Sequence, residues 1–223
     1  MNSKNRSKDQ ANRNVNQAVS VVQIMDGALS EMSSIVTRVR ELAIQSASDT
    51  YSDRERRLIG IEAKQLVNEL ARSAQNTKFQ DNHLLRGDNK KLDIQVDTKD
   101  GKNHRISIDL AEFSQDPVAL GIGDIALDNK HQARLSLVKL DYATKEISRS
   151  RAKAGAFMSR METTSGMLES GSISGKAAHS QIKDADYAKE TAENVKNKLI
   201  SNSQTMVQSQ VNNMGSGLLK LLK

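Results

Sequence analysis

The stretch "VVQIMDGALSEMSSIVTRVRELAIQSASDT", residues 21–50, decides the fold class. Its apolar residues alternate steps of three and four, which is the heptad spacing of long helices that coil around one another. The spacing predicts a helix over about 9–47, which at 1.5 Å per residue is about 57 Å long. The apolar stripe consists of Val22, Met25, Leu29, Met32, Val36, Val39 and Ala43.

The small polar residues after this helix predict a sharp turn into a second helix over about 53–76. Ser52 or Asp53 can accept hydrogen bonds from the free amides at its start, and Glu55 lies in its first turn. Its apolar residues recur on one side, so we expect it to fold back against the first helix.

Two short stretches then show the period-two alternation of β-strands. "LDIQV" (92–96) and "ISIDL" (106–110) flank Asp100-Gly101, a pair that tolerates the positive φ angles of a tight turn. We expect a β-hairpin over about 92–110 that closes one end of a helical rod.

Heptad spacing returns in a second long helix, expected over about 124–169, which supplies the facing side of the seam. The Ser and Gly residues of 170–180 favour a bend, and a thinly apolar helix follows. Because that helix gains little stability alone, we expect it to fray after about 185 until a partner covers it. The second half of the rod seam is Leu140, Ile147, Ala154, Met161 and Leu168, and the C-terminal stripe is Val195, Leu199, Met206, Val211, Met214, Leu218 and Leu221.

Composition narrows the function classes. Aromatic residues make up 3% of the chain and there is one proline, which suits aliphatic helix seams better than a thick core. The net charge is +6, but acidic and basic residues are mixed throughout, so no concentrated basic face for nucleic acid is expected. No apolar run is long enough for a membrane span, and the polar start "MNSKNRSKDQ" is unlike a cleaved signal peptide.

Motifs that support chemistry are missing from the sequence, so we expect no enzyme, no cofactor and no metal site. Without cysteine there is no thiol nucleophile and no thiolate ligand. The four histidines have no metal-type spacing, and "GIGD" (121–124) lacks the lysine of a phosphate loop. Asp184 and Asp186 are two apart on a helix, so their side chains diverge and a catalytic pair is not expected.

Five stretches in the right order give the chain a family resemblance. They are the long stretch that begins "ANRNVNQAVS" (11–50), "NTKFQDNHLLRG" (76–87), "RAKAGAFMSRME" (151–162), "SQIKDADYAKET" (180–191) and "GLLKLLK" (217–223). They closely resemble the two ends of bacterial flagellins, over about residues 11–91 and 133–223. The short part between them looks like a flagellin without large variable domains.

The resemblance implies a mainly α fold: an elongated rod of long antiparallel coiled-coil-like helices with a small β-hairpin, plus a C-terminal helix. Residues 11–184 would be the rod domain and 185–223 the helix that lines the inner core of the filament. Flagellins normally begin with a further N-terminal helix, so 1–10 would be the polar start of a truncated one, in a fragment or a shortened paralogue.

As a function, the resemblance implies a structural subunit of the bacterial flagellar filament that self-assembles with other flagellin subunits for motility. Such a subunit is extracellular and exported by the flagellar secretion apparatus, and an export chaperone would bind the C-terminal helix. The open alternatives are a truncated paralogue that acts as a non-filament helical binding protein, as an export chaperone or a minor filament component, and a hook–filament junction protein.

A host Toll-like receptor that senses flagellin is a further implied partner. Matching the family residue by residue places Arg38, Leu42 and Glu62 on its recognition surface, which is also an inter-subunit surface. Thr37 departs from the glutamine common in strongly recognised members. The alternative is that Arg38 and Glu62 form only a solvated ion pair, which contributes little to stability.

Overall fold

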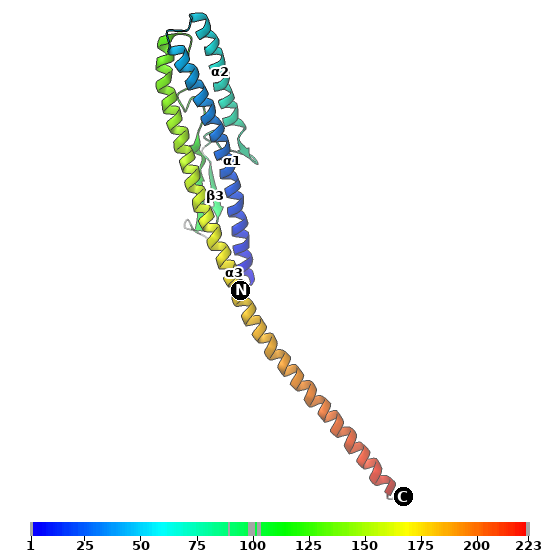
Figure 1. Cartoon of the computed structure of the whole chain (residues 1–223). Helices are drawn as coiled ribbons and strands as arrows, with labels where there is room; N and C mark the ends of the chain where they lie inside the picture. The colour runs from blue at the N-terminus through cyan, green and yellow to red at the C-terminus, as the bar shows by residue number, and fades with distance from the viewer. Residues whose placement is uncertain (1, 89, 98–100, 102–103, 222–223) are drawn as a thin grey trace. The chain divides into compact units, whose positions relative to one another are not determined.

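The computed structural model describes the backbone of residues 2–88, 90–97, 101 and 104–221, and the side chains of these except 2, 186 and 212–221. Three helices dominate it, which confirms the mainly α fold class (Figure 1). The elements in order are α1 (Asn2–Ala47), α2 (Asp53–Asn76), β1 (Lys78–Phe79), β2 (Asn82–His83), β3 (Lys91–Gln95), β4 (Arg105–Asp109), η2 (Leu110–Phe113) and α3 (Lys130–Leu221).

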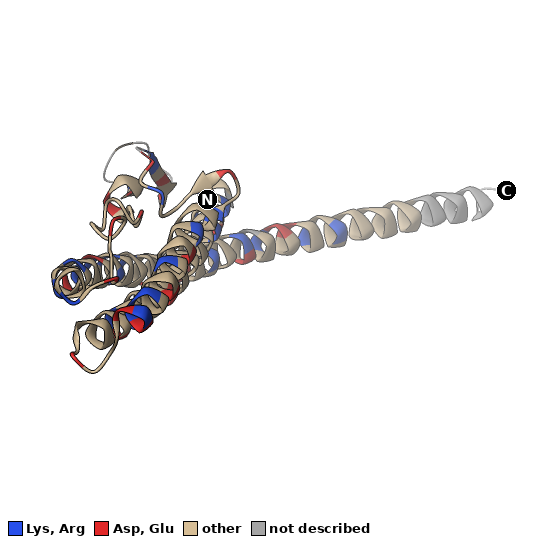
Figure 2. Ribbon diagram, turned by 90° about the horizontal axis from the view of Figure 1, so that it is seen from above, with Lys and Arg blue, Asp and Glu red and all other residues tan. Residues whose placement is uncertain are grey.

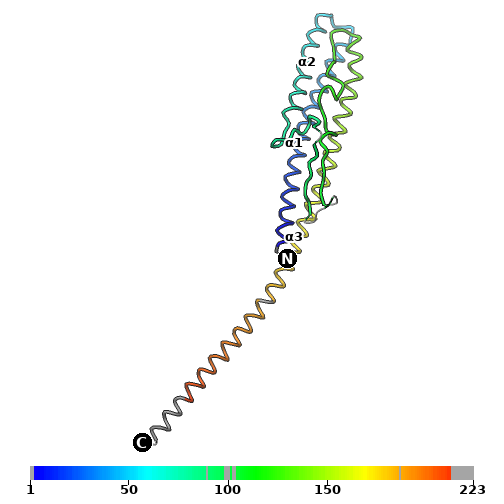
Figure 3. Tube along the Cα trace, turned by 180° about the vertical axis from the view of Figure 1, so that it is seen from behind, coloured from blue at the N-terminus to red at the C-terminus, as the bar shows by residue number. Residues whose placement is uncertain are grey.

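The chain divides into two compact units. Arg6–Gly171 forms the larger one, called here the rod, and Met1–Asn5 with Ser172–Lys223 forms the other. Within the rod, α1, α2 and the first part of α3 lie side by side, with the β-strands along one flank (Figures 1 and 3).

The core of the rod is a seam between α1 and α3, which run antiparallel. The two stripes predicted from the heptads face each other there: every one of their residues is at most 1% exposed except Leu168, which is half-buried. α2 covers a second side with Ala63, Val67 and Leu70. A long thin seam of this kind lets mostly small and aliphatic residues build a continuous core without large aromatics.

α3 begins later than the sequence indicates, at Lys130 and not near Asp124. Residues 116–125 instead form turns, in which Ile122 N–H donates to Pro117 O and Gly121 has a φ of 69°. The helix starts where Asn129 Oδ1 accepts from Gln132 N–H at 2.9 Å, which satisfies a free amide of the first turn. Asp124 faces α3 from outside and accepts from Lys139 Nζ.

Residues 170–180, where the sequence favours a bend, are helical within α3. Two glycines there allow close approach. A Cβ on Gly175 would lie 2.4 Å from Asn5 Oδ1, and one on Gly171 would lie 3.0 Å from Lys8 Nζ, which donates to Gly171 O. α1 also begins at Asn2, before the predicted position 9.

The hairpin of β3 and β4 is antiparallel, with Leu92 opposite Ile108 and Ile94 opposite Ile106. Ile106 and Ile108 are buried in the rod core, and Leu92 and Ile94 are half-buried beside them. Asp100 of the predicted turn lies outside the described residues, whereas Gly101 has the positive φ, 135°, that such a turn requires. A second strand pair, β1 with β2, was not predicted because each strand has only two residues.

We predict that Leu29→Ala destabilises the chain by about 2–5 kcal/mol, because Leu29 is fully buried in the seam and its truncation leaves a cavity. Urea denaturation followed by circular dichroism measures the change. The matched control, Leu58→Ala, removes the same atoms from a side chain that is 62% exposed, and should cost less than about 0.5 kcal/mol. Equal losses in the two variants would contradict the assignment of the core.

Candidate functional site

A ladder of three ion pairs joins α1 and the turn that follows it to α3. Asp26 accepts from Arg151 Nε at 3.0 Å, Arg40 Nε donates to Asp141 at 2.8 Å, and Lys130 Nζ donates to Asp49 Oδ2 at 2.7 Å. From one pair to the next, the residue numbers increase along α1 and decrease along α3, so these pairs fix the register of the antiparallel seam. Each pair is partly solvated, so it selects the register more than it adds stability.

A second polar cluster crosses from α1 to α2. Arg38 donates from Nη1 to Glu41 Oε2 at 3.1 Å and from Nη2 to Glu62 Oε1 at 3.0 Å. The three side chains are each about half exposed. The hydrogen bond to Glu62, followed by that to Glu41, raises the pKa of Arg38, so the cluster presents one cation between two carboxylates. Arg38 and Glu62, predicted on a common surface, are therefore in direct contact.

Leu42, predicted on the same surface, does not lie there. It is 2% exposed and belongs to the rod core. Leu42 lies one helical turn from both Val39 and Arg38, beside the seam stripe, and its side chain is buried in the rod core. Any partner that contacts Arg38 from outside meets polar side chains and not Leu42.

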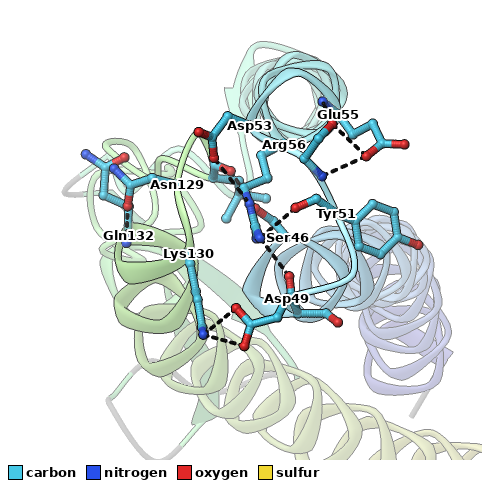
Figure 4. Close-up of polar contacts among 12 residues, drawn as sticks. Ser46, Asp49, Tyr51, Asp53, Glu55, Arg56, Asn129, Lys130 and Gln132 are labelled. Atoms are coloured by element: carbon cyan, nitrogen blue, oxygen red, sulfur yellow. Dashed lines mark hydrogen bonds and ion pairs between the residues drawn. The ribbon is translucent and has the colours of Figure 1, made fainter.

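The turn between α1 and α2 explains why the first helix stops so abruptly (Figure 4). Ser52 and Glu55 form a reciprocal capping box, in which Ser52 N–H donates to Glu55 Oε2 at 2.7 Å and Ser52 Oγ accepts from Glu55 N–H. Arg56, which is 5% exposed, donates from Nη2 to Ser48 O and Tyr51 O, both at 2.8 Å. One buried guanidinium thus satisfies two carbonyls of the turn.

The sequence did not single out Arg56, because an arginine in "RERRL" reads as a solvated charge. Its burial depends on the turn carbonyls that it reaches, and no pattern of neighbouring residues encodes them. Its Nη1 has no hydrogen-bond partner among the described residues. Asp53 is the nearest carboxylate, 3.8 Å from Arg56 Nε.

The part of α3 after Gly171 presents the predicted C-terminal stripe to solvent. Val195, Leu199, Met206 and Val211 are 52–74% exposed. Met214, Leu218 and Leu221 belong to the helix, but their side chains lie outside the described residues. Thr191 and Thr205 donate to the carbonyls four residues earlier, which keeps their hydroxyls within the helix. The stripe is therefore a candidate interaction surface, because apolar side chains grouped in solvent often mark one.

The part of the chain that the structure describes contains no group of three or more His, Asp or Glu side chains close enough to hold a metal ion. None of the helices described there is long and apolar enough to cross a membrane. His83 contacts Gln75 O and His104 contacts Asp97, so each has a local polar partner. Figure 2 shows that the positions of acidic and basic residues are mixed along the helices.

Comparison with known families decides the identity of this arrangement. The bacterial flagellin N-terminal helical region matches residues 1–90, and the bacterial flagellin C-terminal helical region matches residues 137–222. The chain belongs to the bacterial flagellin family. The matched regions coincide with α1–α2 and with α3, the elements that form the seam.

Two relatives extend the match to nearly the whole length of this chain. A flagellin of Halalkalibacterium halodurans is 31% identical over 218 residues, which are 98% of this chain and 79% of the relative. The flagellar filament 30.7 kDa core protein of Treponema maltophilum is 28% identical over 97% of this chain and 80% of its own length.

Solved structures agree on the fold. The crystal structure of Bacillus cereus flagellin matches with a TM-score of 0.62 at 26% identity, over 70% of this chain and 88% of that one. A flagellar hook-associated protein from Vibrio parahaemolyticus matches with a TM-score of 0.64 at 11% identity, over 79% of this chain and 92% of that one, and shares the fold alone. This flagellin is a structural subunit of the bacterial flagellar filament, whose family forms polymers of flagellin subunits.

We predict that this flagellin loses stability in acid through its ion-paired carboxylates. Lys130 lowers the pKa of Asp49 and Lys139 lowers that of Asp124, in both cases mainly by a hydrogen bond. A folded-state pKa below the unfolded value stabilises the fold at neutral pH, and this stabilisation disappears as the pH falls through about 4. Urea denaturation at a series of pH values measures the loss.

The double variant Asp49→Asn, Asp124→Asn should be less stable than the parent at pH 7 and show a shallower loss in acid. Asp81→Asn is the matched control, since Asp81 is exposed and has no ion pair among the described residues. An unchanged acid slope in the double variant would show that these pairs do not carry the pH dependence.

Proposed function

We propose that this flagellin is held in the filament by two surfaces with separate tasks. The rod packs against the rods of neighbouring subunits, and the part of α3 after Gly171 packs into an inner core. The observation that carries this proposal is the exposed stripe of Val195, Leu199, Met206 and Val211. Contiguous apolar side chains gain free energy when neighbours remove them from water, and a filament supplies such neighbours.

Before assembly the same stripe needs protection, and this is the basis for two further parts of the proposal. An export chaperone covers the C-terminal helix inside the cell, and the flagellar secretion apparatus delivers the subunit to the extracellular filament. An amphipathic helix that lies in an apolar groove is the usual mode of such recognition. The predicted fraying after about 185 belongs to the same state, in which no partner covers the helix.

The alternatives differ in what they assemble. A hook–filament junction protein would share the fold but would not grow long filaments, and a non-filament helical binding protein would stay small. The flagellin-specific family match over both ends favours the filament subunit. Electron microscopy and sedimentation of the full chain, alone and mixed with a longer flagellin, separate the three: only the filament subunit enters long polymers.

We predict that Leu199→Asp combined with Met206→Asp abolishes incorporation into filaments or slows it at least roughly tenfold, because two charges would enter an apolar contact. Pelleting of polymer by ultracentrifugation measures incorporation. Ser201→Asp is the control, since residue 201 is exposed and lies on the opposite side of the helix from Leu199 and Met206. Thermal unfolding of the rod should be unchanged in all variants. Normal incorporation of the double variant would overturn the role of the stripe.

A second partner proposed for the free subunit is a host Toll-like receptor that contacts the Arg38–Glu62 cluster. Both side chains are about half exposed and lie on the α1–α2 flank, where a receptor can reach them. Thr37 beside them donates its hydroxyl to Ser33 O at 2.8 Å, so it offers a receptor less than a glutamine would. Leu42 is not part of this surface, because it is buried.

We expect Arg38→Ala to reduce the signal of a cell reporter for the flagellin receptor by roughly tenfold, the scale of removing one partner of an interfacial charge pair. Arg72→Ala is the matched control: Arg72 is also an exposed arginine paired with a glutamate three residues away, Glu69, but it lies further along α2. A signal that survives Arg38→Ala unchanged would argue against receptor recognition at this cluster.

A further inference from the structure

The methionine side chains of this flagellin differ widely in their contact with solvent. The chain has no cysteine, so its eight methionines carry all of its sulfur. The rod buries three of them to at most 1% exposure and a fourth in part: Met25, Met32, Met161 and Met158. Met167 and Met206 are instead 71% and 74% exposed. Among the described side chains, a reagent that attacks sulfur from water therefore meets these two first.

Met206 belongs to the C-terminal stripe, the surface proposed above to pack into the inner core. Val195, Leu199 and Met206 follow one another at steps of four and seven residues on α3, which places them within about 40° of one direction around the helix. Met206 is the most exposed of the three. A neighbour that covers this part of the stripe therefore contacts the thioether.

The surroundings of Met206 are uncharged. The side chains three and four positions away are polar but carry no charge: Asn202, Ser203, Ser209 and Gln210. The whole stretch 199–219 contains no Asp, Glu, Lys, Arg or His. A contact there depends on its apolar side chains, so a polar group introduced at residue 206 removes apolar area that no ion pair of this stretch replaces.

Oxidation by a hydroperoxide introduces such a polar group. The thioether sulfur gives an electron pair to one oxygen of hydrogen peroxide, an S–O bond forms and the O–O bond breaks. The hydroxyl on sulfur then gives its proton to the displaced hydroxide, which leaves as water. The sulfur has lost two electrons and the peroxide has gained them. The product, methionine sulfoxide, is polar and chiral where the thioether was apolar.

We propose that Met206 is a reversible oxidation site that controls assembly, an inference that rests on the role of the C-terminal stripe proposed above. As a thioether, Met206 adds apolar area to the stripe, and its flexible side chain adapts to the surface that it meets. As a sulfoxide, it brings a polar oxygen into an apolar contact, which costs free energy. The oxidised subunit stays out of the filament until a methionine sulfoxide reductase, with a dithiol as electron donor, returns the sulfur to the thioether and releases the oxygen as water.

Met167 provides an internal comparison. It is almost as exposed as Met206, but it belongs to the rod and not to the C-terminal stripe. A peroxide should therefore oxidise both side chains, while only the reaction at Met206 changes the stripe. The methionines in the seam are shielded by the packing of the rod, so a dose that converts the two exposed side chains should leave the fold intact.

Peroxide treatment of the free chain tests the site. Every chain in the experiment carries Met214→Leu, so that Met206 is the one methionine of the stripe. After the oxidant is removed, pelleting measures incorporation into filaments, and peptide mass spectrometry locates the added oxygen. Treatment should lower incorporation at least fivefold when Met206 is present. Met206→Leu should resist, because leucine has a similar volume and no sulfur, whereas the matched control Met167→Leu should remain as sensitive as the parent.

Two further measurements separate the effect of one sulfoxide from general damage. Met206→Gln, which places a neutral polar group at the same position, should lower incorporation without any oxidant. Methionine sulfoxide reductases A and B together should restore at least half of the incorporation of the treated chain, since each enzyme reduces one sulfoxide epimer. Thermal unfolding of the rod should be the same before and after treatment.

The outcomes distinguish this proposal from the one on which it rests. If the untreated chain enters no filament, alone or with a longer flagellin, the filament role itself is wrong. If untreated chains assemble and a chain with the sulfoxide at Met206 enters filaments equally well, only the control by oxidation is overturned. The same conclusion follows if peroxide leaves Met206 unchanged, or if Met167→Leu resists treatment and Met206→Leu does not.

Discussion

The structure depends on the burial of two apolar stripes against each other, which removes both of them from water. The stripe of α1 has heptad spacing, and its complement is the stripe of α3, which the chain reaches after more than eighty intervening residues. Closing such a long loop costs entropy that the seam has to offset, and the cost grows only slowly with loop length. α2, the hairpin and η2 add to the seam from outside, since their buried apolar residues all join the same core cluster.

The seam does not choose its own register, because a heptad stripe shifted by seven residues still packs. The polar pairs make that choice. Asp26–Arg151, Arg40–Asp141 and Asp49–Lys130 are separated by 14 and 9 residues along α1 and the turn after it, and by 10 and 11 on α3. A heptad slip would mismatch this sequence of spacings. Solvated ion pairs that add little stability can thus still decide between alternative alignments.

Most of the correct predictions came from the periodic spacing of apolar residues. Both seam stripes, α2 and the β3–β4 hairpin follow from spacing and turn residues, since these are local signals that agree with the final packing. The start of α3 was missed because Asp124 and Asn129 are both good caps and tertiary packing, not local chemistry, selected Asn129. Leu42 and Arg56 were misjudged for a common reason: burial of a residue beside a stripe depends on which neighbouring element covers it.

Arg56 has a mechanical consequence for the end of the rod. From its place on α2 it holds the carbonyls of Ser48 and Tyr51, and so ties the turn that follows α1 to the first turn of α2. A turn held by these hydrogen bonds resists opening. Torque applied to one helix is then passed on to the other instead of being absorbed by the loop, which is the behaviour required of a part in a rotating shaft.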